Sequence, residues 1–202
     1  MNLKETYNKI ATDWFNDHKE NDWWIESTNK FLSYLKPGSK ILDVGCGPGL
    51  KTKYLIDQGF ELVGIDFSAE MIKLAKEYCP SGKFFVKDIK QALDLDMFDG
   101  VYAQAVLLHI PKSEIIAVLK NFYNSLKTEG CMYLAVKELR EGQKEEQSVM
   151  ENDYNYEYER FFSFFTLPEV KNYLAELGMK ILHENILTNG QTKWVIVIAQ
   201  KN

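Results

Sequence analysis

The stretch "ILDVGCGPGLKTKYL" at residues 41–55 joins an apolar run to three closely spaced glycines and then to a helical pattern. The glycines are Gly45, Gly47 and Gly49, and glycines at this spacing let a backbone approach a ligand closely. The apolar run predicts a buried strand, and the residues after the last glycine predict a helix. A glycine-rich turn between a strand and a helix most often binds phosphate, so two phosphate signatures can be checked against it.

Neither phosphate signature fits this turn. A P-loop has four residues between its glycines, whereas these glycines alternate with single residues, although Lys51 and Thr52 supply the expected lysine and hydroxyl. A dinucleotide fingerprint needs a small residue where this chain has Leu50, so that helix and strand can pack closely over the pyrophosphate. The acid that such sites use for a ribose is present as Asp66. The pattern therefore predicts a nucleoside ligand without its phosphates.

Strand and helix patterns alternate along most of the chain. Such alternation predicts an α/β fold with a Rossmann-like, doubly wound and mostly parallel sheet that carries helices on both faces. The last two of seven strands surround the turn "TNGQ" and predict a closing hairpin with an antiparallel C-terminal strand. The expected strands are 40–45, 60–66, 83–89, 98–106, 130–138, 179–187 and 192–200, and the expected helices are 50–59, 69–79, 113–127 and 167–178.

The composition is that of an ordinary globular protein. A hydrophobic fraction of 46% over 202 residues allows a full core in one domain, whereas two full domains would be cramped. The longest apolar runs have about six residues, far below the roughly 18 that span a bilayer. Cys46, Cys79 and Cys131 are odd in number and widely spaced, which predicts neither a disulfide framework nor a zinc site. With no apolar signal core at the start, we expect a cytoplasmic protein.

Two segments outside the alternating core are expected to cover a substrate site. The leader is helical and holds three of the four tryptophans, and Pro37-Gly38 ends it. The segment after the fifth strand breaks the alternation, and its residues 138–160 carry eight acids against three bases. We expect a single domain that consists of a lid at 1–36, a core at 37–137, a substrate-side insertion at 138–165, and a final helix and hairpin at 166–202.

The motifs, in this order, resemble the class I S-adenosylmethionine-dependent methyltransferases. They are "DVGCGPG" at 43–49, "GIDFS" at 64–68, "KDI" at 87–89 and "FDGVYAQAVLLHIP" at 98–111, and the resemblance covers about residues 37–137. It implies an enzyme that uses S-adenosyl-L-methionine, releases S-adenosyl-L-homocysteine, and transfers the methyl group by in-line displacement. Alignment of the acceptor with the methyl carbon is then the main task of the protein.

The resemblance places cofactor-binding residues at the carboxyl ends of the strands, where open α/β sheets bind ligands. It implies that Asp66 accepts both ribose hydroxyls, that Asp88 binds the adenine amine, and that Asp43 supports the glycine loop. Phe67 and Ile89 would flank the adenine ring, and Gln104 and Ala105 would contact the methionyl amine. Each acid also has a purely structural interpretation, such as the satisfaction of local amides. The expected cofactor-binding residues are Asp43, Gly45, Cys46, Gly47, Gly49, Asp66, Phe67, Met71, Asp88, Ile89, Gln104 and Ala105.

His109 is the histidine placed for chemistry, just beyond the fourth strand. With an unperturbed pKa of about 6.5 it could accept a proton from the acceptor, which makes it the catalytic candidate. A hydrogen bond that anchors the loop fits the same position equally well. His18 and His183 lie far away in the sequence, so the three histidines match no metal-ligand spacing and no metal is expected.

The leader and the insertion are expected to choose the methyl acceptor through Tyr7, Trp14 and Arg160. Because the acids at 138–160 would repel phosphates, we expect a neutral or cationic small molecule. The net charge of -5 argues against nucleic-acid binding, and we expect a monomer or homodimer that binds no membrane. Three alternatives remain: an RNA or protein methyltransferase, a non-catalytic S-adenosylmethionine-binding module, and a nicotinamide dehydrogenase, which Leu50 disfavours.

Overall fold

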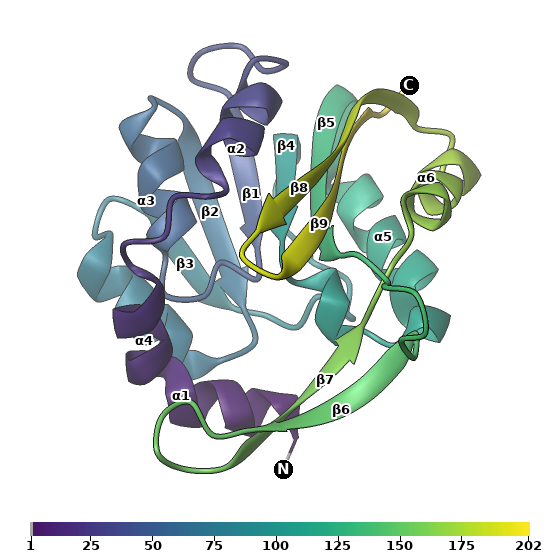
Figure 1. The fold of residues 1–202 in the computed structure, drawn as a ribbon. Coiled ribbons are helices and arrows are strands. Elements are labelled where there is room, and N and C mark those ends of the chain that lie inside the picture. The colour runs from purple at the N-terminus through teal and green to yellow at the C-terminus, as the bar shows by residue number, and fades with distance from the viewer. Residues whose placement is uncertain (1) are drawn as a thin grey trace.

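A seven-stranded sheet forms the centre of the computed structural model, which describes residues 2–202 (Figure 1). The strands follow the order β3-β2-β1-β4-β5-β9-β8, in which the first five are parallel, and β9 is antiparallel to both of its neighbours. The expected fold class is therefore confirmed. The strands are β1 (Lys40–Val44), β2 (Glu61–Asp66), β3 (Lys83–Val86), β4 (Phe98–Gln104), β5 (Leu126–Lys137), β8 (Lys180–Asn189) and β9 (Thr192–Gln200).

The strand order reverses beside β1, and this reversal positions the site. The chain moves outward from β1 to β2 and β3, and then returns to place β4 on the other side of β1. The crossover connections leave a crevice at the carboxyl ends of β1 and β4, which is where open α/β sheets bind ligands. The glycine turn follows β1 directly, so the topology brings it to this crevice.

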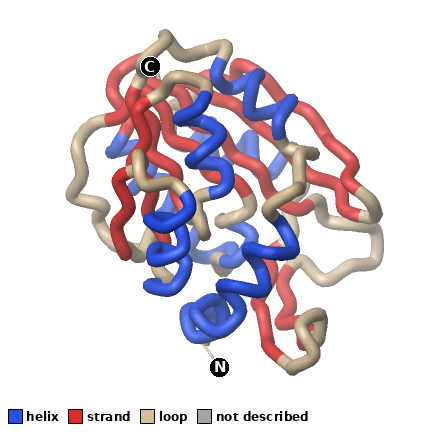
Figure 2. The backbone as a smooth tube through the Cα atoms, turned by 90° about the vertical axis from the view of Figure 1, so that its left-hand side faces the viewer, coloured by secondary structure: helices blue, strands red, loops and turns tan. Residues whose placement is uncertain are grey.

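Helices cover both faces of the sheet (Figure 2). On β4 successive side chains point to opposite faces, so Val101 packs in the same cluster as Phe122 of α5 and Leu174 of α6. Tyr102 packs instead with Phe31 of α2. The helices are α1 (Leu3–His18), α2 (Ile25–Leu32), α3 (Leu50–Asp57), α4 (Ala69–Tyr78), α5 (Lys112–Ser125) and α6 (Leu167–Glu176), with a short 3₁₀ helix η1 (Leu107–His109).

The leader divides into two helices with different surroundings. Helix α2 packs on the sheet, where Ser27 Oγ lies 2.9 Å from the Tyr133 hydroxyl and Thr28 Oγ1 lies 2.7 Å from the Tyr102 hydroxyl. The two tyrosine rings stack with their centroids 4.6 Å apart. Helix α1 begins at a capping box formed with Asn2 and contacts α4 and β7 rather than the sheet. The leader is therefore anchored by its second helix and free to cover a site with its first.

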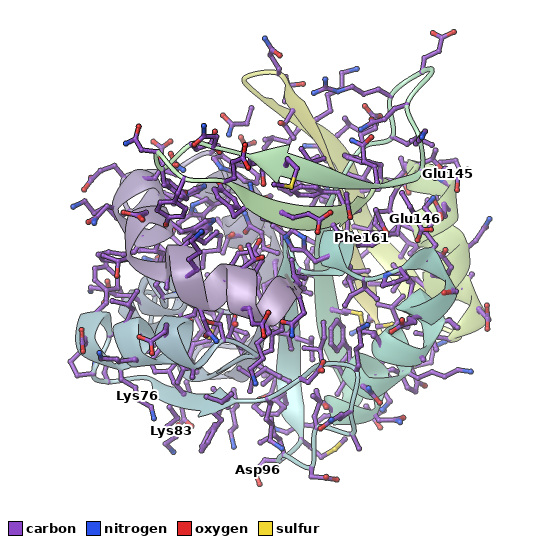
Figure 3. The ribbon with its side chains drawn as sticks, turned by 90° about the horizontal axis from the view of Figure 1, so that it is seen from below. Lys76, Lys83, Asp96, Glu145, Glu146 and Phe161 are labelled. Atoms are coloured by element: carbon purple, nitrogen blue, oxygen red, sulfur yellow. The ribbon has the colours of Figure 1, made fainter. Side chains whose placement is uncertain are left out.

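The insertion forms a two-stranded hairpin of β6 (Glu146–Glu151) and β7 (Tyr158–Ser163), separate from the main sheet. Figure 3 shows this hairpin running alongside α1. The Thr6 hydroxyl donates to the carbonyl oxygen of Glu159 at 2.9 Å, which joins the two segments. Phe162, Phe164 and Phe165 are buried, so the end of the insertion is anchored in the core.

One expected strand is shorter in the structure. Strand β3 ends at Val86, whereas the sequence predicted a strand that included Asp88 and ended at residue 89. The Lys87 amide still donates to the carbonyl oxygen of Asp66, at 2.9 Å. After that, the Asp88 carboxylate accepts a hydrogen bond from the Lys90 amide at 2.9 Å, a local turn that competes with strand pairing.

Between residues 2 and 202, every helix is too short or too polar to cross a membrane. Within the same range, no three histidine, cysteine, aspartate or glutamate side chains come together as metal ligands would.

Candidate functional site

The three glycines of the turn after β1 all have left-handed backbones, with φ of +66° at Gly45, +53° at Gly47 and +81° at Gly49. A Cβ added at Gly45 would lie 2.6 Å from a Val106 methyl carbon, so this glycine lets the turn pack against the end of β4. A Cβ added at Gly47 would meet no atom closer than a Trp14 ring carbon at 3.9 Å. Gly47 therefore leaves open space that a ligand can use.

Asp66 ends β2 and is 7% exposed. Its Oδ2 accepts a hydrogen bond from the Gly47 amide at 3.0 Å, and its Oδ1 accepts one from the Ser68 amide at 2.8 Å. Burial raises the pKa of Asp66 to about 6, against the pull of these amides. A carboxylate has about four acceptor sites, so Asp66 can still accept hydrogen bonds from two hydroxyl groups.

Asp43 and Lys51 form a buried pair of titratable groups beside the turn. The Thr52 hydroxyl donates to Asp43 Oδ2 at 2.6 Å, so the aspartate holds the first turn of α3 in place. Burial raises the pKa of Asp43 and lowers the pKa of Lys51. The Lys51 ammonium lies 5.5 Å from the Trp24 ring centroid and 5.9 Å from that of Trp14, within the range of cation–π attraction.

The end of β4 combines an unpaired amide with a left-handed backbone. The Tyr102 hydroxyl donates to Gln104 Oε1, while Nε2 of the same side chain has no partner anywhere in residues 2–202. Ala105 has a φ of +58°, a conformation that costs a non-glycine residue roughly 1–3 kcal/mol. Its amide donates to the carbonyl oxygen of Ala135 at 2.9 Å. Strain of this kind is concentrated at functional sites.

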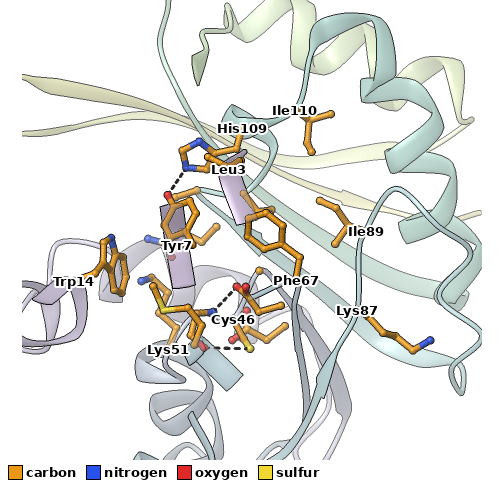
Figure 4. Close-up of a pocket in the computed structure, with 18 residues that line it drawn as sticks. Leu3, Tyr7, Trp14, Cys46, Lys51, Phe67, Lys87, Ile89, His109 and Ile110 are labelled. Carbon is orange, nitrogen blue, oxygen red and sulfur yellow. Dashed lines mark hydrogen bonds between the residues drawn. The ribbon is translucent and has the colours of Figure 1, made fainter. Parts of the chain in front are cut away.

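These features line one cavity at the carboxyl ends of the strands, which we call the first cavity (Figure 4). Ten of the twelve expected cofactor-binding residues line it, all except Gly49 and Asp88. Phe67, Met71 and Ile89 contribute its apolar walls. The topology thus gathers side chains from the ends of four strands around one space.

The two remaining residues have indirect places. Gly49 caps α3, and a Cβ there would lie 3.2 Å from the Ala75 side chain, so this glycine packs α3 against α4. Asp88 is exposed and bonds the Lys90 amide. Its neighbour Ile89 lines the first cavity. Contact between the Asp88 carboxylate and an adenine amine stays a prediction.

A second cavity adjoins the first. The two share the lining residues Tyr7, Trp14, Lys51, Gln104, Ala105 and His109. Aromatic and cationic side chains make up much of the remaining wall, namely Trp23, Trp24, Phe162, Trp194, Lys137 and Arg160. All three residues expected to bind the acceptor line this cavity, because β7 brings Arg160 to the helix that carries Tyr7 and Trp14.

Comparison with known proteins identifies the family. Residues 17–184 match the family model described as a methyltransferase domain. The chain belongs to this methyltransferase family. The class that the sequence motifs resemble, the class I S-adenosylmethionine-dependent methyltransferases, is thereby confirmed, together with its fold.

The relatives of this chain have names that give different methyl acceptors. Phosphoethanolamine N-methyltransferase 3 of Arabidopsis thaliana is 37% identical over 114 residues, which are 52% of this chain and 23% of the relative. Ubiquinone biosynthesis O-methyltransferase of Pelagibacter ubique is 28% identical over 65% of this chain and 62% of its own. Among solved structures, the 1,6-didemethyltoxoflavin-N1-methyltransferase of Burkholderia thailandensis, with bound S-adenosylhomocysteine, aligns with a TM-score of 0.78 and 18% identity over 99% of this chain and 87% of that one. The chain spans about a quarter of the length of the first curated relatives it matches.

The first cavity fits S-adenosylmethionine. Asp66 has acceptor sites for the ribose hydroxyls, and the apolar walls suit an adenine ring. Gln104 Nε2 is a buried donor without a partner in the described chain, and such a donor costs about 1–3 kcal/mol until an acceptor reaches it. The methionyl part of the cofactor carries acceptor oxygens. Gly47 leaves the backbone open on the same side.

The acids of the insertion do not face the two cavities. None of the eight acids at 138–160 lines either cavity. Two of them, Glu145 and Glu146, bond Lys112 at the opposite end of the hairpin from its turn, and Figure 3 shows both on the side of the molecule away from that turn. The expectation of a neutral or cationic acceptor rested on these acids, so its premise is wrong.

His109 is held at both ring nitrogens. The carbonyl oxygen of Phe161 can only accept, so Nδ1 carries the proton and donates to it at 2.8 Å. Nε2 then accepts a hydrogen bond from the Tyr7 hydroxyl at 2.7 Å. Burial lowers the pKa of His109 to about 3. The loop-anchoring bond that the sequence allowed is therefore present, and a second bond holds α1.

The sequence patterns did not identify two lysines of the site as functional residues. The sequence suggests Lys51 only as part of a P-loop, although its place as the second residue of α3 puts it beside both cavities. Lys137 is the last residue of β5, and β5 runs parallel to β4, so the rule that ligands bind at the carboxyl ends of strands would have found it.

Proposed function

We propose that this chain transfers the methyl group of S-adenosylmethionine to a small molecule that binds in the second cavity. One observation carries the proposal: a cavity that suits a nucleoside shares six lining residues with a cavity that has polar and aromatic walls. Two ligands can therefore meet at the shared residues, close enough for a group to pass between them.

Different residues of the first cavity would bind different parts of the cofactor. When bound, S-adenosylmethionine supplies a methyl group that its sulfonium already activates. Asp66 would accept the ribose hydroxyls, and Lys51 and Gln104, at the boundary of the cavities, would donate to the methionyl carboxylate. For Gln104 this role replaces the expected contact with the methionyl amine, because its unpaired atom is the donor Nε2. A lysine buried without a carboxylate in hydrogen-bond contact gains more from such a partner than an exposed lysine does.

The main contribution of the chain is alignment. Tyr7 and Trp14 lie on α1 and line both cavities, so α1 can hold the acceptor in line with the methyl carbon and exclude water. Correct placement of two reactants can supply on the order of 7–11 kcal/mol of the barrier. A base is needed only for an acceptor that must lose a proton.

We infer that His109 positions Tyr7 rather than taking the proton itself. Its Nε2, the nitrogen that could act as a base, already accepts the Tyr7 hydroxyl. A pKa of about 3 also makes His109 a weak base at neutral pH. Catalysis by His109, the prediction from the sequence, requires the contact with Tyr7 to open first.

Calorimetry with the full chain tests cofactor binding. We expect S-adenosylhomocysteine to bind with one site per chain and NAD to give no heat of binding, because Leu50 stands where a pyrophosphate site needs a small residue. Incubation with a metabolite extract and S-adenosylmethionine that carries a labelled methyl group should then label a small product.

Each alternative has its own outcome. Binding of NAD without S-adenosylhomocysteine would replace the proposal with a dehydrogenase. Cofactor binding without labelled product from any extract or macromolecule would indicate a non-catalytic module. Label in RNA or protein, and none in small molecules, would place the acceptor among macromolecules.

A further inference from the structure

We propose that the acceptor is an anion, a small molecule with a carboxylate or phosphate group that Lys137 binds inside the second cavity. This inference rests on the proposed function, since it names the class of molecule that the second cavity takes. It replaces the neutral or cationic acceptor expected from the sequence. Three features of the cavity wall carry it: a lysine without an anionic partner, an arginine beside it, and an indole donor without an acceptor.

Lys137 brings a positive charge into the cavity wall without a matching negative one. Its ammonium lies 4.2 Å from the centroid of the Phe162 ring, and it forms no salt bridge with any residue between 2 and 202. Burial, and then the charge of Arg160, lower the pKa of Lys137 to about 8. The lysine is still mostly charged at neutral pH, and an anion in the cavity would favour that form.

Arg160 adds to the positive potential but is itself neutralised. Its Nη2 donates to Glu151 Oε1 at 2.6 Å, and its Nε donates to the other oxygen of the same carboxylate. The side chains of Arg160 and Glu151 are only 16% and 18% exposed, so the pair is well formed. Glu151 does not line the cavity, whereas Arg160 does. One carboxylate thus serves two neighbouring cations, and Lys137 remains in excess.

Trp194 supplies a second donor that lacks an acceptor. It is 7% exposed, and its indole N–H has no hydrogen-bond partner in the described part of the chain. Its ring stacks on Trp23 with the centroids 4.6 Å apart. Trp194 also lies opposite Lys137 in the register of β5 and β9, so both donors belong to the same part of the sheet. A buried donor without a partner is costly, and an acceptor oxygen would remove the cost.

The wall of the second cavity has no carboxylate, among the described residues, that could bind a cation. Within residues 2–202, no aspartate or glutamate lines the second cavity. A cationic acceptor would therefore meet positive charge without compensation, and a neutral one would leave Lys137 unpaired. A carboxylate or phosphate satisfies both the lysine and the indole N–H, while the aromatic walls accommodate the apolar part of the molecule.

Probe binding tests the inference directly. The full chain, saturated with S-adenosylhomocysteine, is titrated with benzoate, phenyl phosphate, benzamide and benzylamine. We expect one of the two anions to bind at least about tenfold more tightly than benzamide and benzylamine, since a hydrogen bond to a charged group is worth about ten- to hundredfold in affinity. Equal or tighter binding of the neutral or cationic probe would overturn the proposal.

A pair of lysine variants tests whether Lys137 is the residue that binds the anionic probe. Lys137→Gln should weaken binding of the anionic probe about tenfold or more and leave the affinity for S-adenosylhomocysteine unchanged, which also reports that the variant is folded. Lys120→Gln, on the exposed side of α5, removes the same charge far from the cavity and should change neither affinity. Anion binding that Lys137→Gln leaves intact would contradict the role of this lysine.

The charge of the natural acceptor can be tested independently of the probes. A metabolite extract is passed over an anion exchanger, and labelled methyl transfer is measured for the retained and unretained fractions. We expect the acceptor in the retained fraction, and phosphatase treatment that abolishes it would identify a phosphate rather than a carboxylate. An acceptor in the unretained fraction would overturn the anionic proposal but not the methyltransferase. Absence of S-adenosylhomocysteine binding would instead overturn the proposed function.

Discussion

Gly45 and Gly47 have the same left-handed backbone, yet a methyl group added to each would meet different surroundings. At Gly45 it would collide with Val106, and at Gly47 it would enter open space in the first cavity. We therefore expect Gly47→Ala to lower the affinity for S-adenosylhomocysteine by at least about tenfold, measured by calorimetry, because the Cβ occupies space needed by the ligand.

A matched glycine separates this effect from backbone strain. Gly38 also has a positive φ, +76°, and a Cβ there would meet no atom within 4 Å. Gly38→Ala should therefore lower the free energy of unfolding about as much as Gly47→Ala, roughly 1 kcal/mol or more, and leave ligand affinity unchanged. Equal ligand affinities of the two variants would refute the assignment of Gly47.

The change in kcat on substitution of His109 distinguishes a general base from a positioning residue. General-base catalysis contributes about 10²–10⁴-fold to a rate. If His109 only positions Tyr7, His109→Ala should reduce kcat by less than about tenfold and raise the KM for the acceptor. The assay uses the extract fraction that supports methyl transfer. A loss of kcat beyond a hundredfold, with loss of a pH-dependent step from the rate profile, would restore His109 as the base.

At the scale of elements, α1 is held over the site by polar side chains on its neighbours. The Ser68 hydroxyl donates to Asn8 Oδ1 at 2.7 Å, and the Tyr156 hydroxyl donates to Asp13 Oδ2 at 2.6 Å. Because α1 contacts α4 and β7, whereas α2 packs its apolar side chains on the main sheet, α1 can open and close more easily than α2. We expect amide hydrogen exchange of α1 to slow when S-adenosylhomocysteine binds, while exchange of α5 stays the same.

Two asparagines on α1 provide matched variants for this test. Asn8→Ala removes the bond to Ser68 and should speed the exchange of α1 in the free protein. Asn16→Ala changes an exposed asparagine on the same helix, so it should have little effect. The role of α1 as a lid would be contradicted if its amide exchange did not slow on ligand binding. Equal exchange rates of α1 in the two variants would contradict it as well.

The elements also show how far the sequence could predict the structure. Alternating apolar patterns located the strands of the sheet, and ten of the twelve cofactor candidates that the family resemblance implied line one cavity. Local patterns did not reveal that β3 ends at Val86, because a side-chain turn at Asp88 decides it. The direction of the acidic side chains was also beyond the sequence, because it depends on the pairing of β6 with β7 and on the partners that Lys112 offers.

At the scale of the whole molecule, two buried groups of the site make stability depend on pH in opposite directions. Burial raises the pKa of Asp66 from 3.8 to about 6, so its ionisation costs the folded state stability as the pH rises through 6. Burial lowers the pKa of His109 from 6.5 to about 3, so stability is lost as the pH falls below 6.5. The two effects offset each other in the total free energy of unfolding.

A single substitution isolates the contribution of the Asp66 carboxylate to the free energy of unfolding. Relative to the natural chain, Asp66→Asn should gain roughly 3 kcal/mol in the free energy of unfolding between pH 4 and pH 7, because asparagine has no charge to bury. Denaturant unfolding of both chains across this range measures the difference, and a difference that stays constant with pH would contradict a raised pKa for Asp66. The same variant should bind S-adenosylhomocysteine about ten- to hundredfold more weakly.

The hydroxyl bonds between α2 and the sheet have a consequence for synthesis. Ser27 and Thr28 reach tyrosines that follow them by 106 and 74 residues, so α2 has no complete docking surface until β5 has left the ribosome. At translation rates of about 5–20 residues per second, the leader waits roughly 5–20 s with Phe31 and Leu32 uncovered. Protease protection of the leader on arrested nascent chains should therefore appear only after Tyr133 has emerged.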